Sequence, residues 1–155
     1  MQRGFFIPAN ILRLALVLAI FERMRISALT ACLLLIASCF FPWATIESKN
    51  IIITGIDTGG TSFGKPAYMH FLLSSLIIIF LLLKKGWAHK MAIFFAAFNL
   101  AWALRNFFII PMCRGGECPE KHIAIYLVLL FAVLIIIFSL LIPSPVLKEK
   151  DNSYE

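Results

Sequence analysis

The chain has 155 residues, of which 61% are hydrophobic and only 14% are charged, and its net charge is +6. A soluble domain carries about 25% charged residues, so this composition excludes an ordinary soluble domain. The positive charge does not indicate a nucleic-acid partner, because the basic residues flank apolar stretches, as membrane topology requires. We expect one domain, an all-α membrane protein built as an up-down-up-down bundle of four transmembrane helices.

Residues 1–25 are predicted to form an interfacial helix on the inner membrane surface, with the long side chain of Arg13 reaching toward water. The alternative is an upstream extension, with translation starting at Met24. Met24 and Arg25 would then begin a signal-like segment, and the run from Ile36 to Cys39 resembles the lipobox of bacterial lipoproteins, with Cys39 acylated. Because the chain stays apolar after this cysteine, we favour an uncleaved span.

Four apolar stretches carry the prediction of the bundle. A bilayer core about 30 Å thick requires roughly 20 apolar residues in a helix. A helix also pairs its backbone polar groups internally, which lipid demands. Together the stretches form a transmembrane domain over residues 26–143, followed by a tail at residues 144–155. The predicted spans cover about residues 26–46, 66–83, 91–112 and 123–142.

Basic residues gather on one side of these spans. Arg23 and Arg25 precede the first span, Lys84, Lys85 and Lys90 separate the second from the third, and lysines follow the fourth. The positive-inside rule then places both termini and the middle loop in the cytoplasm.

The first outer loop runs from about Glu47 to Pro66 and contains a β-branched run at residues 51–54 that predicts a short strand. Gly59 to Lys65 satisfies the first seven positions of a phosphate-binding P-loop, but Pro66 stands where Ser or Thr is needed. Asp57-Thr58-Gly59 resembles an aspartic-protease motif, which needs a second carboxylate. We therefore predict a turn stabilised by the Asp57 side chain.

The second outer loop holds Cys113 and Cys118, separated by four residues. On an oxidising side this pair predicts a disulfide, either as a staple between the third and fourth spans or as a redox-active pair. Four-span thiol oxidoreductases of the disulfide-bond-forming type resemble the chain in span number, but they rely on a Cys-x-x-Cys pair that is missing here. Adding His122 gives only three candidate metal ligands, so we expect no metal and no cofactor.

The third span carries the polar residues Asn99, Trp102, Arg105 and Asn106 at helical spacing, and His70 of the second span is expected at a similar depth. An ionisable residue in a membrane must face a partner, a watery cavity or the interface. One interpretation is an outward-facing pocket for an anionic group, a lipid head or a quinone. The other is a hydrogen-bonded lock for the outer loops, with a carboxylate partner for Arg105 among Glu47, Asp57, Glu117 and Glu120.

Phe41-Pro42-Trp43 at the end of the first span and the run from Ile53 to Gly59 resemble small four-span bacterial inner-membrane proteins without an assigned activity. The resemblance covers about residues 24–143 and implies the topology and the inner membrane only. In outline the chain also resembles the claudin-like architecture, although the paired cysteines and the Gly-Leu-Trp signature of that family's first loop are missing.

These observations predict a non-enzymatic membrane protein that acts through contacts with the lipid bilayer, a membrane-protein partner or a second copy of itself. The first alternative is a periplasm-facing thiol-redox or quinone-linked oxidoreductase that uses Cys113 and Cys118. The second is a small transporter subunit, which would need to oligomerise to build a pathway.

Overall fold

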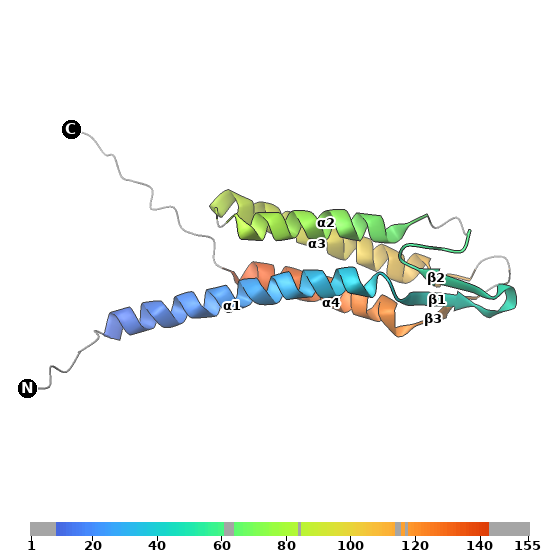
Figure 1. Ribbon diagram of the computed structural model, residues 1–155, viewed down its shortest axis with the longest axis horizontal. Helices are drawn as coiled ribbons and strands as arrows, with labels where there is room; N and C mark the ends of the chain where they lie inside the picture. The colour runs from blue at the N-terminus through green and yellow to red at the C-terminus, as the bar shows by residue number, and fades with distance from the viewer. Residues whose placement is uncertain (1–8, 61–63, 84, 114–115, 117, 143–155) are drawn as a thin grey trace, which may run out of the picture.

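The computed structural model describes residues 9–60, 64–83, 85–113, 116 and 118–142. Four helices lie side by side, and a small sheet extends from one end of them (Figure 1). We call this end the sheet end. The opposite end, which carries Arg23, Arg25, Lys85 and Lys90, is called the basic end. The elements are α1 (Ala9–Ser38), β1 (Pro42–Ile46), a 3-10 turn (Glu47–Lys49), β2 (Ile51–Thr54), α2 (Pro66–Leu82), α3 (Gly86–Ile109), β3 (Glu120–Lys121) and α4 (Ile123–Leu141).

The helices pack in a ring, with α1 against α4 and α2, and α3 against α2 and α4. Alanines and other apolar side chains fill the space between them, among them Ala28, Ala92 and Ala132, each fully buried. By length and composition, α3 and α4 are the described helices that could cross a membrane, while α2 is a shorter apolar helix of 17 residues.

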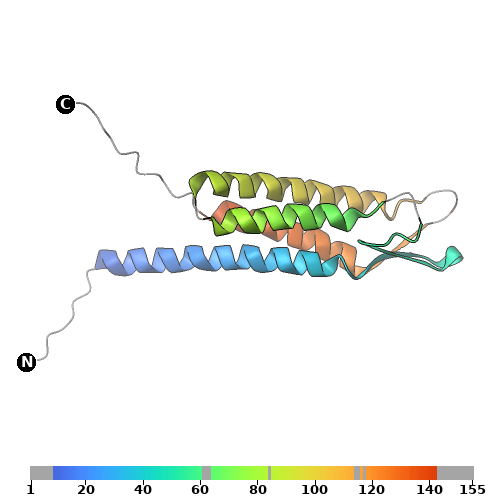
Figure 2. The ribbon, with the colours of Figure 1, turned by 45° about the horizontal axis from the view of Figure 1, so that its top comes forward.

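Helix α1 differs from the sequence prediction in two respects. It runs without interruption from Ala9 to Ser38, so the expected boundary at residue 25 is absent. Its first half extends past the other three helices at the basic end (Figure 2). It also ends eight residues before the predicted limit at residue 46, because Pro42 cannot continue a helix and begins β1 instead.

The sheet has the strand order β2-β1-β3, with both pairs antiparallel. The predicted β-prone segment does form β2, and it pairs with β1 through Ile53 opposite Ala44 and Ile51 opposite Ile46. The third strand, β3, comes from the second loop and was not predicted. It brings Lys121 opposite Ala44, so the two loops form one structure.

The sheet is tied to the helices through Trp43 and Gly55. Trp43 is fully buried, its Nε1 donates to the carbonyl of Ser38 (3.1 Å), and its own carbonyl accepts from the amide of His122 (2.9 Å). The amide of Gly55 donates to the carbonyl of Cys39 (3.2 Å), and its carbonyl accepts from the amide of Ala67 (2.8 Å). The end of α1, the start of α2 and the start of α4 therefore meet at this junction.

The loop after β2 turns back along that strand. Asp57 Oδ1 accepts from the amide of Gly59 (3.0 Å), and the carbonyl of Asp57 accepts from the amide of Thr54 (2.7 Å). The predicted turn stabilised by the Asp57 side chain is thus confirmed. Gly59 has a left-handed φ of 58°, and a Cβ there would lie 2.3 Å from Cγ2 of Ile51, so the loop packs against β2. Residues 61–63, in the middle of the P-loop-like run, lie outside the described residues.

Candidate functional site

Four polar side chains are buried between α2 and α3. His70 and Ser74 lie one turn apart on α2, and Asn99 and Asn106 lie two turns apart on α3, so each pair shares one helix face. The exposed fraction is zero for His70, Ser74 and Asn99 and 2% for Asn106. A buried polar group without a partner is costly, so these four must pair with one another.

Their hydrogen bonds form a chain. Nδ1 of His70 donates to Oδ1 of Asn99 (2.6 Å), and Nδ2 of Asn99 donates to Oγ of Ser74 (3.2 Å). Nδ2 of Asn106 points to Nε2 of His70 at 3.5 Å. All three contacts are consistent with a neutral imidazole that carries its proton on Nδ1, which we assign from this network.

Two tryptophans, Trp43 and Trp102, lie next to this cluster. The Trp43 ring meets the His70 ring edge-on, with 6.1 Å between the ring centres. Nε1 of Trp102 donates to the carbonyl of Pro66 in the first turn of α2 (3.0 Å). The cluster thus links α2, α3 and the strand that starts the sheet. Because its members are buried and paired with one another, the geometry favours a lock between helices and offers no open face to a ligand.

Arg105 lies at the edge of this cluster, next to Trp102 and Asn106, and is not buried with it. Its side chain is exposed, and its guanidinium carbon lies 4.6 Å from the centre of the Trp102 ring. One of its amino groups donates a long hydrogen bond to Oδ1 of Asn106 (3.4 Å). In the described part of the chain it forms no ion pair, so the expected carboxylate partner is not found among Glu47, Asp57 and Glu120, while Glu117 lies outside that part.

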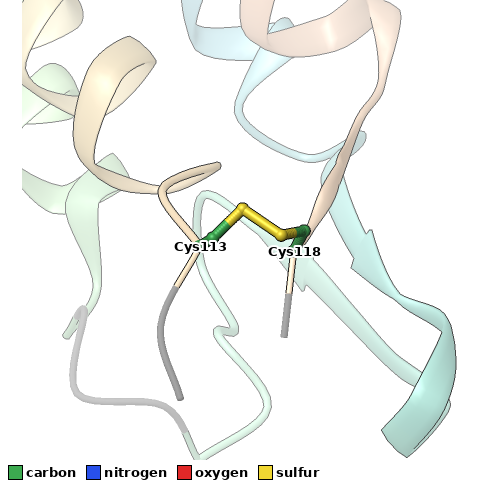
Figure 3. Close-up of a disulfide and its surroundings, with 2 residues drawn as sticks. All are labelled: Cys113 and Cys118. Atoms are coloured by element: carbon green, nitrogen blue, oxygen red, sulfur yellow. A yellow bond between two sulfur atoms is a disulfide. The ribbon is translucent and has the colours of Figure 1, made fainter. Parts of the chain in front are cut away.

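The two loop cysteines are bonded to each other, which confirms the predicted disulfide (Figure 3). Their Cα atoms are 4.2 Å apart, and both residues are exposed at the sheet end. Cys32 of α1 and Cys39, the residue that follows α1, are fully buried free thiols. His122 instead makes a hydrogen bond with the Thr45 hydroxyl. Within the described residues, no three His, Cys, Asp or Glu side chains gather as metal ligands.

Two apolar pockets, which the sequence did not suggest, lie on the outside of the helices. One of about 310 Å³ sits at the sheet end, where β1 and α4 begin, and is lined by Phe41, Pro42, His122, Ile123, Ala124 and Leu127. The other, of about 270 Å³, lies between α1 and α4 and is lined by Ile26, Ser27, Thr30, Ala31, Leu34, Phe131, Leu134 and Phe138. Neither contains a residue of the His70 cluster.

No protein-family model, no curated protein and no solved structure matches this chain. The fold and the candidate site therefore rest on the chain's own residues. The resemblance of residues 24–143 to small four-span bacterial membrane proteins stays a prediction.

Proposed function

We propose that the chain is a multi-pass protein of the bacterial inner membrane, with four spans and cytoplasmic termini, which acts through contacts with lipid or with another membrane protein and not by catalysis. The observation that carries this proposal is the exposed apolar surface of the helices. Large side chains such as Leu72, Phe98 and Leu130 are each at least half exposed, on three different helices. In water such a surface causes aggregation, whereas in lipid it is the normal exterior of a span.

The lengths of α2 and α4 support two of the proposed spans. At 1.5 Å per residue, α2 with its 17 residues is about 26 Å long, and α4 with 19 residues is about 29 Å long. Both lengths suit a hydrocarbon core of about 30 Å. In α1, the part beyond Arg25 is shorter, and the exposed rings of Phe40 and Phe41 extend its apolar surface toward the sheet.

The charges support the orientation. The basic end carries Arg23, Arg25, Lys85 and Lys90, and the positive-inside rule assigns such an end to the cytoplasm. The sheet and the disulfide then lie on the oxidising side, where disulfides persist. There the sheet is the part of the protein that a partner outside the membrane would meet, and its edge strand β3 has only two residues, both charged, which protects that edge from strand pairing.

Labelling of single introduced cysteines in intact cells tests this topology. Lys49 and Lys85 are both exposed but lie at opposite ends of the helices. We expect a membrane-impermeant maleimide to label the Lys49→Cys protein from outside. The Lys85→Cys protein should react only after the cells are permeabilised. Labelling of Lys85→Cys in intact cells would reverse the orientation, and release of the protein by alkaline carbonate would show that it does not span the membrane.

The exposure of Cys113 and Cys118 favours one alternative, a thiol-redox function in which the disulfide accepts two electrons from a dithiol. A structural staple and a redox pair respond differently when both cysteines are replaced by serine. For a staple we expect the free energy of unfolding to fall by about 2 kcal/mol, the value for so short a loop. Thermal unfolding of the purified protein, with and without reductant, measures this loss.

The redox alternative is checked on the same protein by following oxidation of a dithiol such as dithiothreitol under anaerobic conditions. A structural disulfide reacts slowly with the dithiol, and each protein molecule oxidises at most one dithiol molecule. Repeated oxidation of the dithiol in the presence of a quinone, lost in the double serine variant with unchanged unfolding, would favour the enzyme over the contact protein.

A further inference from the structure

The groove between α1 and α4 lies on the outside of the helices toward the basic end. Its lining is apolar except for two hydroxyl groups from α1, and one of these, Oγ1 of Thr30, already donates to the carbonyl of Ile26 (2.9 Å). On the α4 side the walls are the half-buried side chains of Leu134 and Phe138. The groove therefore suits an apolar occupant.

One cationic side chain lies on the same stripe of α1 as the groove. Arg23 precedes Ser27 by four residues, Thr30 by seven and Leu34 by eleven, so all four lie within about 60° of one another around the helix. Arg23 is exposed and, among the described residues, has neither an ion-pair nor a hydrogen-bond partner. Arg25 is different, since it lies on roughly the opposite face of α1 and pairs with Glu22 at 3.1 Å.

We infer that this groove binds one acyl chain of an anionic phospholipid of the inner leaflet, whose phosphate is held by Arg23. The inference rests on the proposed membrane topology and deepens it. From Arg23 to Leu34 the stripe is about 16 Å long, which is about half of the 30 Å hydrocarbon core and thus the depth of one leaflet. A guanidinium at the head-group level is also the cation best suited to a phosphate, because its donors match two phosphate oxygens.

A helix of a second copy fits the groove less well. The groove of about 270 Å³ is open along one side, and a second helix would fill it only with the side chains of one ridge. Helices in membranes also pair through small residues on both sides, whereas Leu134 and Phe138 are large. A free phosphate would use Arg23 but leave the groove unfilled.

Native mass spectrometry of the full chain in neutral detergent tests the inference. The probes are dioleoyl phosphatidylglycerol, dioleoyl phosphatidylcholine and inorganic phosphate. We expect the wild type to retain phosphatidylglycerol in preference to phosphatidylcholine, and Arg23→Gln to bind phosphatidylglycerol roughly tenfold more weakly, as for the loss of a hydrogen bond to a charged group. Lys90→Gln is the matched control, because Lys90 is exposed at the same end but on α3.

A second variant, Ser27→Trp, fills the groove without changing the charge and should weaken the binding of both lipids. Equal binding of phosphatidylglycerol by the wild type and Arg23→Gln would overturn the inference. Complete displacement of the lipid by inorganic phosphate would also overturn it, because the site would then bind phosphate alone. A dimer that Ser27→Trp abolishes would overturn it as well, because the groove would then bind a second copy. Carbonate extraction of the same variants tests the membrane topology separately from the lipid site. A protein that stays in the membrane but binds no phosphatidylglycerol contradicts the lipid site and leaves the topology intact.

Discussion

Replacement of Gly55 by alanine should lower the free energy of unfolding by about 3 kcal/mol, the upper range for adding a methyl group to a packed interior. A Cβ at this position would lie 2.8 Å from the carbonyl oxygen of Cys39, 2.8 Å from the Trp43 ring and 3.0 Å from the Cβ of Ala67. The first contact is with backbone, which cannot rotate away. The two backbone hydrogen bonds of Gly55 connect the sheet to the end of α1 and the start of α2. The helices should therefore lose stability together with the sheet. Thermal unfolding in detergent measures the effect.

Gly60 provides the matched control in the same loop. It has a φ of 79°, and a Cβ there would have no neighbour within 4 Å, so Gly60→Ala adds only backbone strain of about 1 kcal/mol. Equal stability losses for Gly55→Ala and Gly60→Ala would mean that the junction around Trp43 is not packed as described.

The apolar runs and their breaks predict much of the helical part of the fold. Pro66 marks the start of α2, because proline is well suited to the first turn of a helix. The prediction placed the end of the first helix too late, at residue 46. Phe40, Phe41 and Trp43 continue the apolar sequence, although the helix ends at Ser38. Pro42 was the available signal, because the residue before a proline disfavours helical geometry. Pairing of β3 with β1 depends on contacts distant in sequence, which no local pattern reports.

The continuity of α1 has a local reason. The charges from Glu22 to Arg25 suggested a boundary between an interfacial helix and a span. On a helix, however, Glu22 and Arg25 lie three residues apart and form an ion pair, which supports the helical conformation through this segment. A cluster of charged residues therefore does not by itself show that a helix ends there.

The candidate site was predicted in part. Asn99 and Asn106 share one face of α3. His70 of α2 contacts both of them, as predicted from the positions of these residues along the two helices. Arg105 was placed on the same stripe, yet at 100° per residue it lies about 120° around the helix from Asn99, which explains its exposure. The role of Ser74 as acceptor for Asn99 depends on the register of α2 against α3, which no local sequence pattern reports.

Replacement of Asn99 by leucine should cost about 3 kcal/mol of unfolding free energy. The leucine removes the acceptor of Nδ1 of His70 and the donor to Oγ of Ser74, and both groups are fully buried, so each loses its partner without access to water. A buried polar group left unpaired costs about 1–3 kcal/mol. Lys90→Gln is the control, because Lys90 is exposed on the same helix, more than two turns from Asn99, and its change should stay within about 0.5 kcal/mol.

The double variant His70→Leu with Asn99→Leu separates a structural lock from a functional polar site. If the cluster serves only to hold α2 against α3, the double variant should be more stable than Asn99→Leu alone, because it no longer leaves Nδ1 of His70 buried without an acceptor. It should remain less stable than the wild type, because Ser74 and Asn106 still lose their partners. Thermal unfolding of the two single variants and the double variant completes the cycle. Additive losses would show that the two side chains do not share a buried hydrogen bond.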